Sequence, residues 1–295
     1  MEPLRVGKVK DVYDLGDRLL FQFSDRISVF DKIIPVKIKD KGESLCRTSQ
    51  YWFEILREMG YKTDFIQLKS GNSMEVQKFR ISEAGGSKFW INFLIPLEFI
   101  MRHYVAGSLF DRLKSGEMDY KELGLRSDFK VGDQLDVPFF EMTTKFEATD
   151  RPVDFKEASS IGGLYEEEIY RIKDMIERID TRIQREVGAR GLIHADGKKE
   201  LALSLHREPV IVDTFGTADE DRFWEADEFE KGTIVELSKE RVRQYYRTTG
   251  YHKKLYDARK NGLSEPEIPP LPDEIVDQTS ALYRNMYERI TGKKW

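Results

Sequence analysis

The chain has 295 residues, of which 34% are charged and 40% are hydrophobic, and its formal net charge is −5 at pH 7. This composition predicts a folded globular protein of one large or two modest domains and excludes an intrinsically disordered chain. The small acidic excess argues against nucleic-acid binding, and the single cysteine, Cys46, excludes an intrachain disulfide and a cysteine-rich zinc site.

The N-terminus, MEPLRVGKVKD, lacks the apolar core of a signal peptide. The most apolar window, residues 89–101, contains Pro96 and Glu98 and is too short to span a membrane as a helix. We therefore expect a cytoplasmic protein without a membrane partner.

The first predicted element is a β-hairpin over residues 4–23. Its first strand carries RVGKVKDVY, in which Lys8 and Lys10 share one face and Gly7 lets a backbone approach a ligand closely. Two lysines beside a glycine suit the phosphates of a nucleotide, although the pattern is neither GxGxxG nor a Walker A loop. A solvated edge strand with protective lysines is the alternative interpretation.

A polar loop follows over residues 23–35, where Asp25 and Arg26 either contact a ligand or form ion pairs within the loop. The spacing of apolar residues then predicts a helix over 43–59, in which Cys46 is interpreted as a packing residue.

Two strands are predicted next, at about 63–68 and 73–81, and the second of them carries Lys78. In a nucleotide site, the backbone that leaves such a strand can bind adenine. The short connections between these strands predict an antiparallel sheet through residue 81.

The most specific stretch is LIPLEFIMRHYVAGS, residues 94–108, which predicts a buried strand, a turn and a helix start. Glu98 and Arg102 interrupt its apolar run, and a buried charge is costly unless it is paired or liganded. The small residues before Ser108 leave backbone N–H groups free, so the guanidinium and the hydroxyl suit a phosphate or carboxylate. A Glu98–Arg102 ion pair with an ordinary serine cap is the alternative.

Residues 116–160 are predicted to be turn-rich and irregular. Within them, FFEMTTKFEATDRPV offers Lys145 and Asp150 to a ligand, or else forms a plain surface loop. An isoleucine stripe then predicts a core helix over 164–187.

Two further strands are predicted in GLIHADGKKELALSL and PVIVDTFGTADEDRFW. Asp196, Lys198 and Glu200 alternate along the first and therefore share one face, and Asp213 ends an apolar run in the second. Carboxylates with a lysine suit a Mg²⁺–triphosphate site, while a hairpin with cross-strand salt bridges is the alternative.

The histidines do not predict a zinc site, because they are scattered without ligand spacing: His103, His194, His206 and His252. Beyond Trp224, the sequence predicts a helix near 239–247, a proline-rich linker and a last helix from Asp273.

Residues 94–108 closely resemble a signature of the SAICAR (phosphoribosylaminoimidazole-succinocarboxamide) synthetase family. That signature is two apolar residues, Pro, apolar, Glu, any, Ile, apolar, Arg, three of any kind, then Ala-Gly-Ser. The family also has a Ser-Asp-Arg-Ile-Ser element after its first hairpin, which this chain matches around Asp25 and Arg26.

The chain also matches a second family signature at its charged positions. That signature is Asp-x-Lys-apolar-Glu-Phe-Gly, then an Asp strand, then Ser-Arg-apolar-Trp. The chain departs from the usual residues at several other positions: Lys199, Leu201, Ala202, Thr214 and residues 218–221.

The resemblance covers roughly residues 5–290 and implies an α+β fold. An N-terminal antiparallel β lobe, kinase-like or ATP-grasp-like, would comprise residues 1–83, and a larger α+β lobe residues 84–295, with ATP in the cleft between them. The implied activity is an ATP-dependent ligase of purine biosynthesis, which joins carboxyaminoimidazole ribonucleotide and L-aspartate through an acyl phosphate. The resemblance further implies ATP and Mg²⁺ as cofactors, these small molecules as partners, and a homo-oligomer.

By the same resemblance, residues of four roles are expected. Those that contact the nucleotide are Gly7, Lys8, Lys10 and Lys78. Those that bind Mg²⁺ are Glu200 and Asp213. Those that bind the ribonucleotide or place the amino acid are Arg102, Ser108, Arg222, Asp25, Arg26 and Asp150. Those with a catalytic role are Lys198, Lys145 and Asp196.

Two other classes of function remain open. A divergent ligase or kinase with another acceptor is motivated by the altered residues 199–202 and 218–221. A non-catalytic nucleotide-binding protein is disfavoured, because Lys198, Glu200 and Asp213 are all present.

Overall fold

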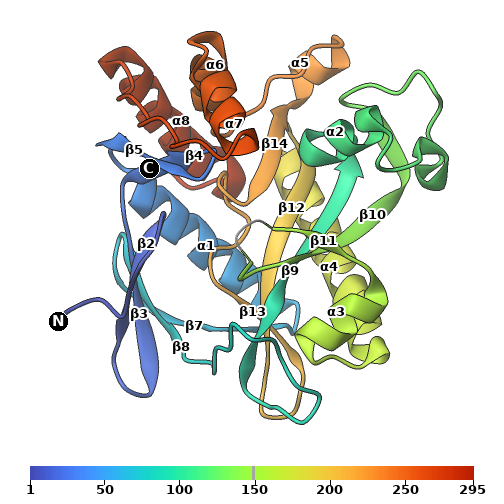
Figure 1. Cartoon of the computed structure of the whole chain (residues 1–295). Helices are drawn as coiled ribbons and strands as arrows, with labels where there is room; N and C mark the ends of the chain where they lie inside the picture. The colour runs from blue at the N-terminus through green and yellow to red at the C-terminus, as the bar shows by residue number, and fades with distance from the viewer. Residues whose placement is uncertain (148–149) are drawn as a thin grey trace.

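An antiparallel sheet forms the N-terminal part of the structure, a computed structural model that describes residues 1–147 and 150–295 (Figure 1). Its strand order is β1-β2-β3-β8-β7. The bounds are β1 Arg5–Val6, β2 Lys10–Asp14, β3 Arg18–Phe23, β7 Phe65–Ser70 and β8 Ser73–Gln77. β2 and β3 pair as neighbours, so the predicted hairpin is confirmed over residues 10–23. The first predicted strand is divided, because β1 pairs antiparallel with β2. A separate two-stranded ribbon, β4 (Arg26–Val29) and β5 (Lys32–Lys37), follows it.

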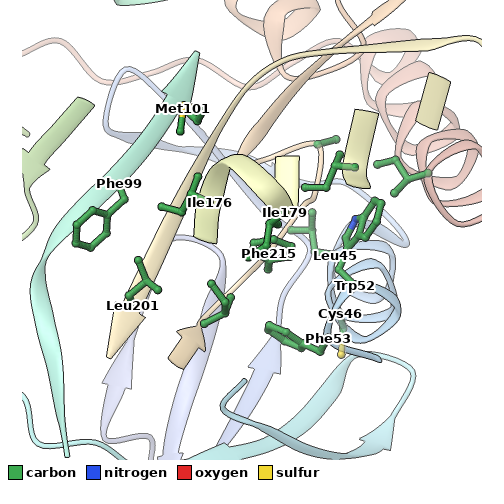
Figure 2. Close-up of a cluster of buried hydrophobic side chains, with 14 of the residues drawn as sticks. Leu45, Cys46, Trp52, Phe53, Phe99, Met101, Ile176, Ile179, Leu201 and Phe215 are labelled. Atoms are coloured by element: carbon green, nitrogen blue, oxygen red, sulfur yellow. The ribbon is translucent and has the colours of Figure 1, made fainter. Parts of the chain in front are cut away.

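Helix α1 (Lys41–Glu58) connects this sheet to the rest of the molecule and packs against α8 (Asp273–Thr291). Its buried face includes Leu45, Trp52 and Phe53, which lie in the main hydrophobic core shown in Figure 2. Cys46 is fully buried in the same core, so its interpretation as a packing residue is confirmed.

A larger sheet of seven strands crosses the middle of the molecule. Its order is β11-β10-β9-β12-β13-β6, and β14 also pairs with β12. The bounds are β6 Lys62–Thr63, β9 Phe93–Tyr104, β10 Gln134–Thr144, β11 Pro152–Val153, β12 Leu192–Leu203, β13 Pro209–Val212 and β14 Asp221–Glu225. The pairs are antiparallel except for β13 with β6, which is parallel.

Helices α3 (Phe155–Gly162) and α4 (Glu166–Gly188) pack on one face of this sheet. The isoleucines of α4 meet Phe99 and Met101 of β9 and Leu201 of β12 in the core. The helix predicted over 164–187 is thereby confirmed. Because successive strand residues point to opposite faces, the residues between these apolar ones point away from α4.

The prediction for residues 116–160 is wrong in part, because β10 is an eleven-residue strand that pairs with β9. Pro138 and the charged residues beside it obscure the alternation in the sequence, and a register shift between Gln134 and Phe139 accommodates the irregular part. Pairing with the long neighbouring strand overrides the weak local signal. The segment before β10 holds α2 (Gly107–Ser115) and the 3₁₀ helix η1 (Tyr120–Leu123).

Two predicted strands end earlier than expected. β8 stops at Gln77 rather than near residue 81, and PVIVDTFGTADEDRFW forms two strands, β13 and β14. The loop between β13 and β14 begins at Asp213, whose φ of +72° is incompatible with continued extended structure.

The remaining helices are α5 (Ala226–Glu230), α6 (Glu240–Thr248) and α7 (Tyr251–Lys260). Among the described residues, no helix combines the length and apolar character needed to cross a bilayer. The mixture of helices and antiparallel sheets confirms the α+β class. The division at residue 83 stays a prediction; β6, from the N-terminal side of it, pairs with β13 in the larger sheet.

Candidate active site

The face of the larger sheet opposite α4 carries Glu98 and Arg102 of β9 and Asp196, Lys198 and Glu200 of β12. Asp196 pairs in register with Arg102, and Glu200 with Glu98. Lys198 lies between Asp196 and Glu200 along β12, and its ammonium group contacts Glu98 (2.7 Å) and Glu200 (3.7 Å). The predicted shared face of Asp196, Lys198 and Glu200 is therefore confirmed.

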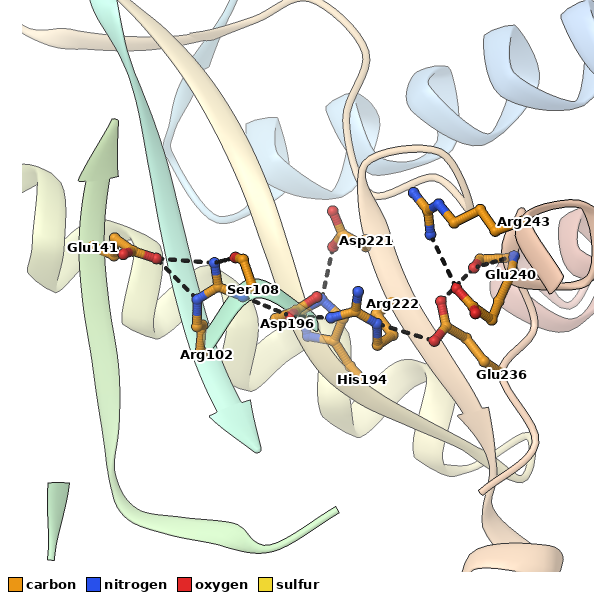
Figure 3. Close-up of polar contacts among 11 residues, drawn as sticks. Arg102, Ser108, Glu141, His194, Asp196, Asp221, Arg222, Glu236, Glu240 and Arg243 are labelled. Carbon is orange, nitrogen blue, oxygen red and sulfur yellow. Dashed lines mark hydrogen bonds and ion pairs between the residues drawn. The ribbon is translucent and has the colours of Figure 1, made fainter. Parts of the chain in front are cut away.

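One end of this face is an arginine–serine corner, which comprises Arg102, Ser108, Asp196 and Arg222 (Figure 3). Arg102 donates to the Ser108 hydroxyl (3.1 Å) and to the Asp196 carboxylate (3.1 Å). Arg222 donates to the same Asp196 oxygen at 2.5 Å. Two guanidinium groups thus converge on one carboxylate at the start of α2.

Glu141 and Glu236 complete the charge balance of this corner. Glu141 accepts from Arg102 at 2.9 Å, and Glu236 pairs with Arg222 at 3.2 Å. Because Arg102 pairs with Glu141 and Asp196 while Glu98 pairs with Lys198, the alternative of a Glu98–Arg102 ion pair is wrong.

Gly107 makes room for the second guanidinium at the start of α2. Its φ is +54°, and a Cβ atom there would lie 2.7 Å from Nη2 of Arg222. Only glycine satisfies both constraints without strain. The exposed N–H groups of the first turn and the guanidinium groups therefore face the same small volume, which is the arrangement that binds phosphate at helix N-termini.

The other end of the face is acidic, and its carboxylates Glu200 and Asp213 each pair with a lysine ammonium group. Lys145, just after β10, contacts Glu200. Lys10, from β2 of the N-terminal sheet, contacts Asp213 and donates to the Thr214 hydroxyl at 3.2 Å. Carboxylate oxygens are ligands that Mg²⁺ prefers, so Glu200 and Asp213 have the donor chemistry that this ion takes.

The pKa values of these groups follow from burial and from their neighbours. Burial alone would raise the pKa of Asp213, but the ammonium groups of Lys10 and Lys145 outweigh it and hold that pKa below its ordinary value. Burial raises the pKa of Glu98 to about 7, despite the opposing charge of Lys198. Asp213 is thus ionised and ready to bind a cation, whereas Glu98 changes protonation near neutrality.

The corner and the acidic end lie on the same face of the same strand. Asp196 and Glu200 are four residues apart on β12, which corresponds to about 13 Å at 3.3 Å per residue. The two ends are therefore joined by one strand, and a shared cavity around Arg102, Ser108, Glu200 and Asp213 stays a prediction.

The prediction of one strand through Gly7, Lys8 and Lys10 is wrong, because Gly7 and Lys8 lie in a turn between β1 and β2 and the two lysines therefore do not share a strand face. The N–H of Gly7 donates to the carbonyl of Lys10 at 2.9 Å, and a Cβ atom at Gly7 would lie 2.7 Å from that oxygen. Arg26 donates to the Gly7 carbonyl (2.9 Å) and pairs with Asp11 (2.5 Å). Arg26 therefore stabilises the turn before Lys10, and its guanidinium group contacts other protein groups.

Three other predicted residues make contacts within the N-terminal part. Lys8 forms an exposed pair with Asp31 at 2.8 Å. Asp25 accepts from the N–H of Gly42 at 3.0 Å, in the first turn of α1. Lys78 donates to Asp14 at 2.7 Å beside the turn between β2 and β3, and this contact gives no support to a nucleotide role.

Asp150 lies near the acidic end. Burial raises its pKa, and the charges that act on it include Lys198, Lys145 and Lys8. Residues 148 and 149, within the same predicted ligand loop, lie outside the described residues.

The family model for SAICAR synthetase matches residues 3–258. The chain belongs to the SAICAR synthetase family. The phosphoribosylaminoimidazole-succinocarboxamide synthase of Thermoplasma acidophilum is 57% identical over 297 residues, with 100% of both chains covered. The enzyme of the same name from Nitrosopumilus maritimus is 35% identical and covers 99% of each chain.

Solved structures of SAICAR synthetases share the fold. The Saccharomyces cerevisiae SAICAR synthase complexed with SAICAR has a TM-score of 0.78 at 24% identity and covers 100% of this chain and 96% of its own. A SAICAR synthetase in complex with ADP has a TM-score of 0.69 at 24% identity, with 99% and 98% covered.

Two of the departures from the second SAICAR synthetase signature, Lys199 and Asp221, lie on the opposite face of β12, against α4. Lys199 is fully buried and pairs with Asp180 of α4 at 2.5 Å. The Asp221 carboxylate accepts a hydrogen bond from Nε2 of His194 at 2.7 Å. A β-bulge between His194 and Asp196 turns the histidine to this side.

This buried cluster also brings together histidines that the sequence analysis treated as scattered. The rings of His103 and His194 are 5.8 Å apart, and a ligand atom of Asp180 lies within 4.8 Å of theirs. Within this cluster Lys199 pairs with Asp180 and His194 pairs with Asp221, so protein groups contact both carboxylates. Spacing along the chain could not show this, because the residues come from β9, α4 and β12.

Sequence reasoning missed several functional-site residues. Glu98 was noticed only as a costly buried charge, and Glu141 and Glu236 gave no signal beyond their charge. Their partners lie on other strands and loops, so the sequence could not reveal them.

Proposed function

We propose that this chain catalyses ATP-dependent formation of an amide between the carboxylate of carboxyaminoimidazole ribonucleotide and the amine of L-aspartate. Its membership of the SAICAR synthetase family supports the reaction, and relatives of the same fold were solved with SAICAR and with ADP. The observation that carries the proposal for this chain's residues is the placement of a phosphate-type corner and an acidic, lysine-rich end on one face of β9 and β12.

The reaction requires activation of a carboxylate, because oxide is a poor leaving group. Transfer of the γ-phosphoryl group from ATP forms an acyl phosphate and ADP. The aspartate amine then attacks the acyl carbon, phosphate leaves with the C–O bond electrons, and the amine loses a proton. Such steps depend on positioning and on cationic groups rather than on a protein nucleophile.

The lysines at the acidic end would bind the triphosphate. Lys10 and Lys145 now lie against Asp213 and Glu200, and phosphate oxygens would draw both ammonium groups away from these carboxylates. Glu200 and Asp213 would then hold Mg²⁺, with Lys198 beside them. Mg²⁺, when bound, neutralises charge on the phosphate oxygens.

The arginine–serine corner would bind the phosphate of the ribonucleotide. Arg102, Arg222, the Ser108 hydroxyl and the first turn of α2 converge there, and Asp196 now occupies the place of the anion. A ribonucleotide bound at this corner would extend along β12 toward Lys198 and Glu200, where the phosphoryl group would arrive.

The amino acid would bind beside the acidic end. The charges of Lys198 and Lys145 act on Asp150 and lower its pKa against the effect of burial, and its carboxylate suits an ammonium group. Asp25 and Arg26 contribute indirectly in this proposal, because Arg26 holds the turn of Gly7 and Asp25 holds the start of α1.

The relatives disfavour the alternative of a different acceptor, because chains up to 57% identical carry the synthase name. The departures from the family signature divide between the two sides of β12. Lys199 and Leu201 face α4, whereas Glu220 contacts Lys198 at 3.2 Å and Thr214 accepts from Lys10, so the last two lie at the substrate face.

The test is ADP formation from ATP with the ribonucleotide, measured with and without L-aspartate, together with the mass of the product. We expect ADP and a product heavier than the ribonucleotide by one aspartate less water. Absence of this product while other carboxylate–amine pairs release ADP would favour the divergent ligase instead.

A further inference from the structure

Asp64 lies where the two sheets meet, between β6 and β7. Its N–H donates to the carbonyl of Ile211 in β13 at 2.9 Å, and its carbonyl accepts from the N–H of Gln77 in β8 at 2.7 Å. β13 belongs to the larger sheet and β8 to the N-terminal sheet. One residue thus joins the strand that leads to Asp213 with the sheet that carries Lys10.

The side chain of Asp64 is directed at the same place. It is buried, at 2% exposed, and its Oδ2 accepts from the backbone N–H of Asp213 at 3.1 Å. Its Oδ1 makes no hydrogen bond to any residue that the structure describes. The side chain is therefore dedicated to the backbone of Asp213.

Asp213 needs such support because its backbone is strained. A φ of +72° is a left-handed backbone conformation that residues other than glycine rarely adopt. Strained residues persist where the surroundings determine their conformation from several sides. At Asp213, the carboxylate accepts from the N–H of Thr214 at 2.5 Å and contacts Lys10, and the backbone N–H is held by Asp64.

We propose that Asp64 is a positioning residue, which fixes the backbone of Asp213 and thereby directs its carboxylate toward the Mg²⁺–phosphate end of the site. The inference rests on the proposed function, in which Asp213 binds the metal ion. Asp64 must supply an acceptor oxygen within hydrogen-bond distance of the backbone N–H of Asp213. Its negative charge is not required.

Two variants separate these properties. Asp64→Asn keeps an acceptor oxygen in nearly the same shape, whereas Asp64→Leu keeps a branched side chain of larger volume and removes the acceptor. If Asp64→Leu does not fold, Asp64→Ala removes the acceptor without added bulk. Ser44→Ala is the matched control, because Ser44 also makes a buried hydrogen bond, to the Tyr283 carbonyl at 2.7 Å, away from the site.

The readout is Mn²⁺ binding to the full-length protein with ADP, followed by electron paramagnetic resonance, alongside the Mg²⁺ dependence of ADP formation. We expect Asp64→Leu or Asp64→Ala to weaken Mn²⁺ binding on the order of tenfold, as loss of a group that orients a ligand does. Asp64→Asn should stay within about twofold of the unaltered protein by the same reasoning, and Ser44→Ala should lower only the melting temperature.

Unchanged Mn²⁺ affinity in folded Asp64→Leu or Asp64→Ala overturns the inference. Equal loss in Asp64→Asn and Asp64→Leu also overturns it, because the charge would then be the essential property. Asp213→Asn distinguishes failure of the positioning role of Asp64 from failure of the proposed metal binding by Asp213. If Mn²⁺ affinity is unchanged in that variant, the metal assignment in the proposed function is wrong.

Discussion

The ammonium group of Lys10 on β2 contacts the carboxylate of Asp213 at the end of β13, so a cation from the N-terminal sheet neutralises an anion of the larger sheet. The lysine is only 11% exposed and lies 4.7 Å from the ring centre of Phe21. Its position is set by the Gly7 turn, which Arg26 holds from behind. This contact is the direct link between the nucleotide-binding and acidic halves of the proposed site.

Replacement of Lys10 should therefore impair ATP use specifically. We expect Lys10→Met to raise the KM for ATP and lower kcat, for a combined loss of about 2 kcal/mol or more, because a charge-assisted contact to phosphate is removed. Steady-state kinetics with each substrate varied in turn would measure it. Lys62→Met, which removes an exposed pair with Glu208, should leave these constants unchanged. An altered KM for the ribonucleotide alone would contradict the assignment.

The arginine–serine corner predicts a different kinetic signature. Arg102→Ala should lower kcat/KM for the ribonucleotide by at least ~2 kcal/mol, about 30-fold, with Arg222→Ala similar. Arg207→Ala is a matched control, since Arg207 has the same 17% exposure as Arg222 and pairs with Glu168 at 2.7 Å on another part of the sheet. The control should lose stability but keep its KM. Unchanged kinetics in a folded Arg102→Ala protein would remove Arg102 from the site.

The buried cluster behind β12 predicts a strong effect on stability. Lys199→Met leaves Asp180 buried without its ammonium partner and should lower the free energy of unfolding by about 3–5 kcal/mol. Lys199→Met with Asp180→Asn should recover part of this loss, because the second change removes the uncompensated charge. Urea unfolding of the two variants measures the difference. Equal stability of the single and double variants would show that the pair is not coupled.

Glu98 predicts a pH-dependent contribution to stability. Its folded-state pKa is about 7 against an ordinary 4.5, because burial penalises the charged form. Between these values the folded protein holds a proton that the unfolded chain has lost, so raising the pH costs stability, in total roughly 3 kcal/mol. The loss is complete above pH 7 and absent below pH 4.5.

Glu98→Gln removes this titration. Relative to the unaltered protein, the variant should gain in unfolding free energy between pH 5 and pH 8, when both are measured by urea denaturation. A difference that does not change with pH would mean that Glu98 titrates at its ordinary value. Asp14→Asn is the control, since its carboxylate is on the surface.

Much of the local structure was predictable from periodicity and motif. The first hairpin, the isoleucine stripe of α4 and the shared face of Asp196, Lys198 and Glu200 follow from repeats of two and of three to four residues. The Arg102–Ser108 part of the arginine–serine corner was predictable because the two residues are close in the chain, whereas Asp196 and Arg222 join it from distant strands.

Local periodicity determines which face a side chain occupies, and residues adjacent in the chain stay adjacent in space. The amino-acid sequence by itself therefore determined the family, the main elements and the inward charges of β9 and β12. Only the tertiary structure decided the partners: Lys198 rather than Arg102 for Glu98, Lys199 for Asp180, and Asp64 for the backbone of Asp213. Partners depend on the register of strands far apart in the chain, on bulges and on a left-handed residue, none of which local patterns encode.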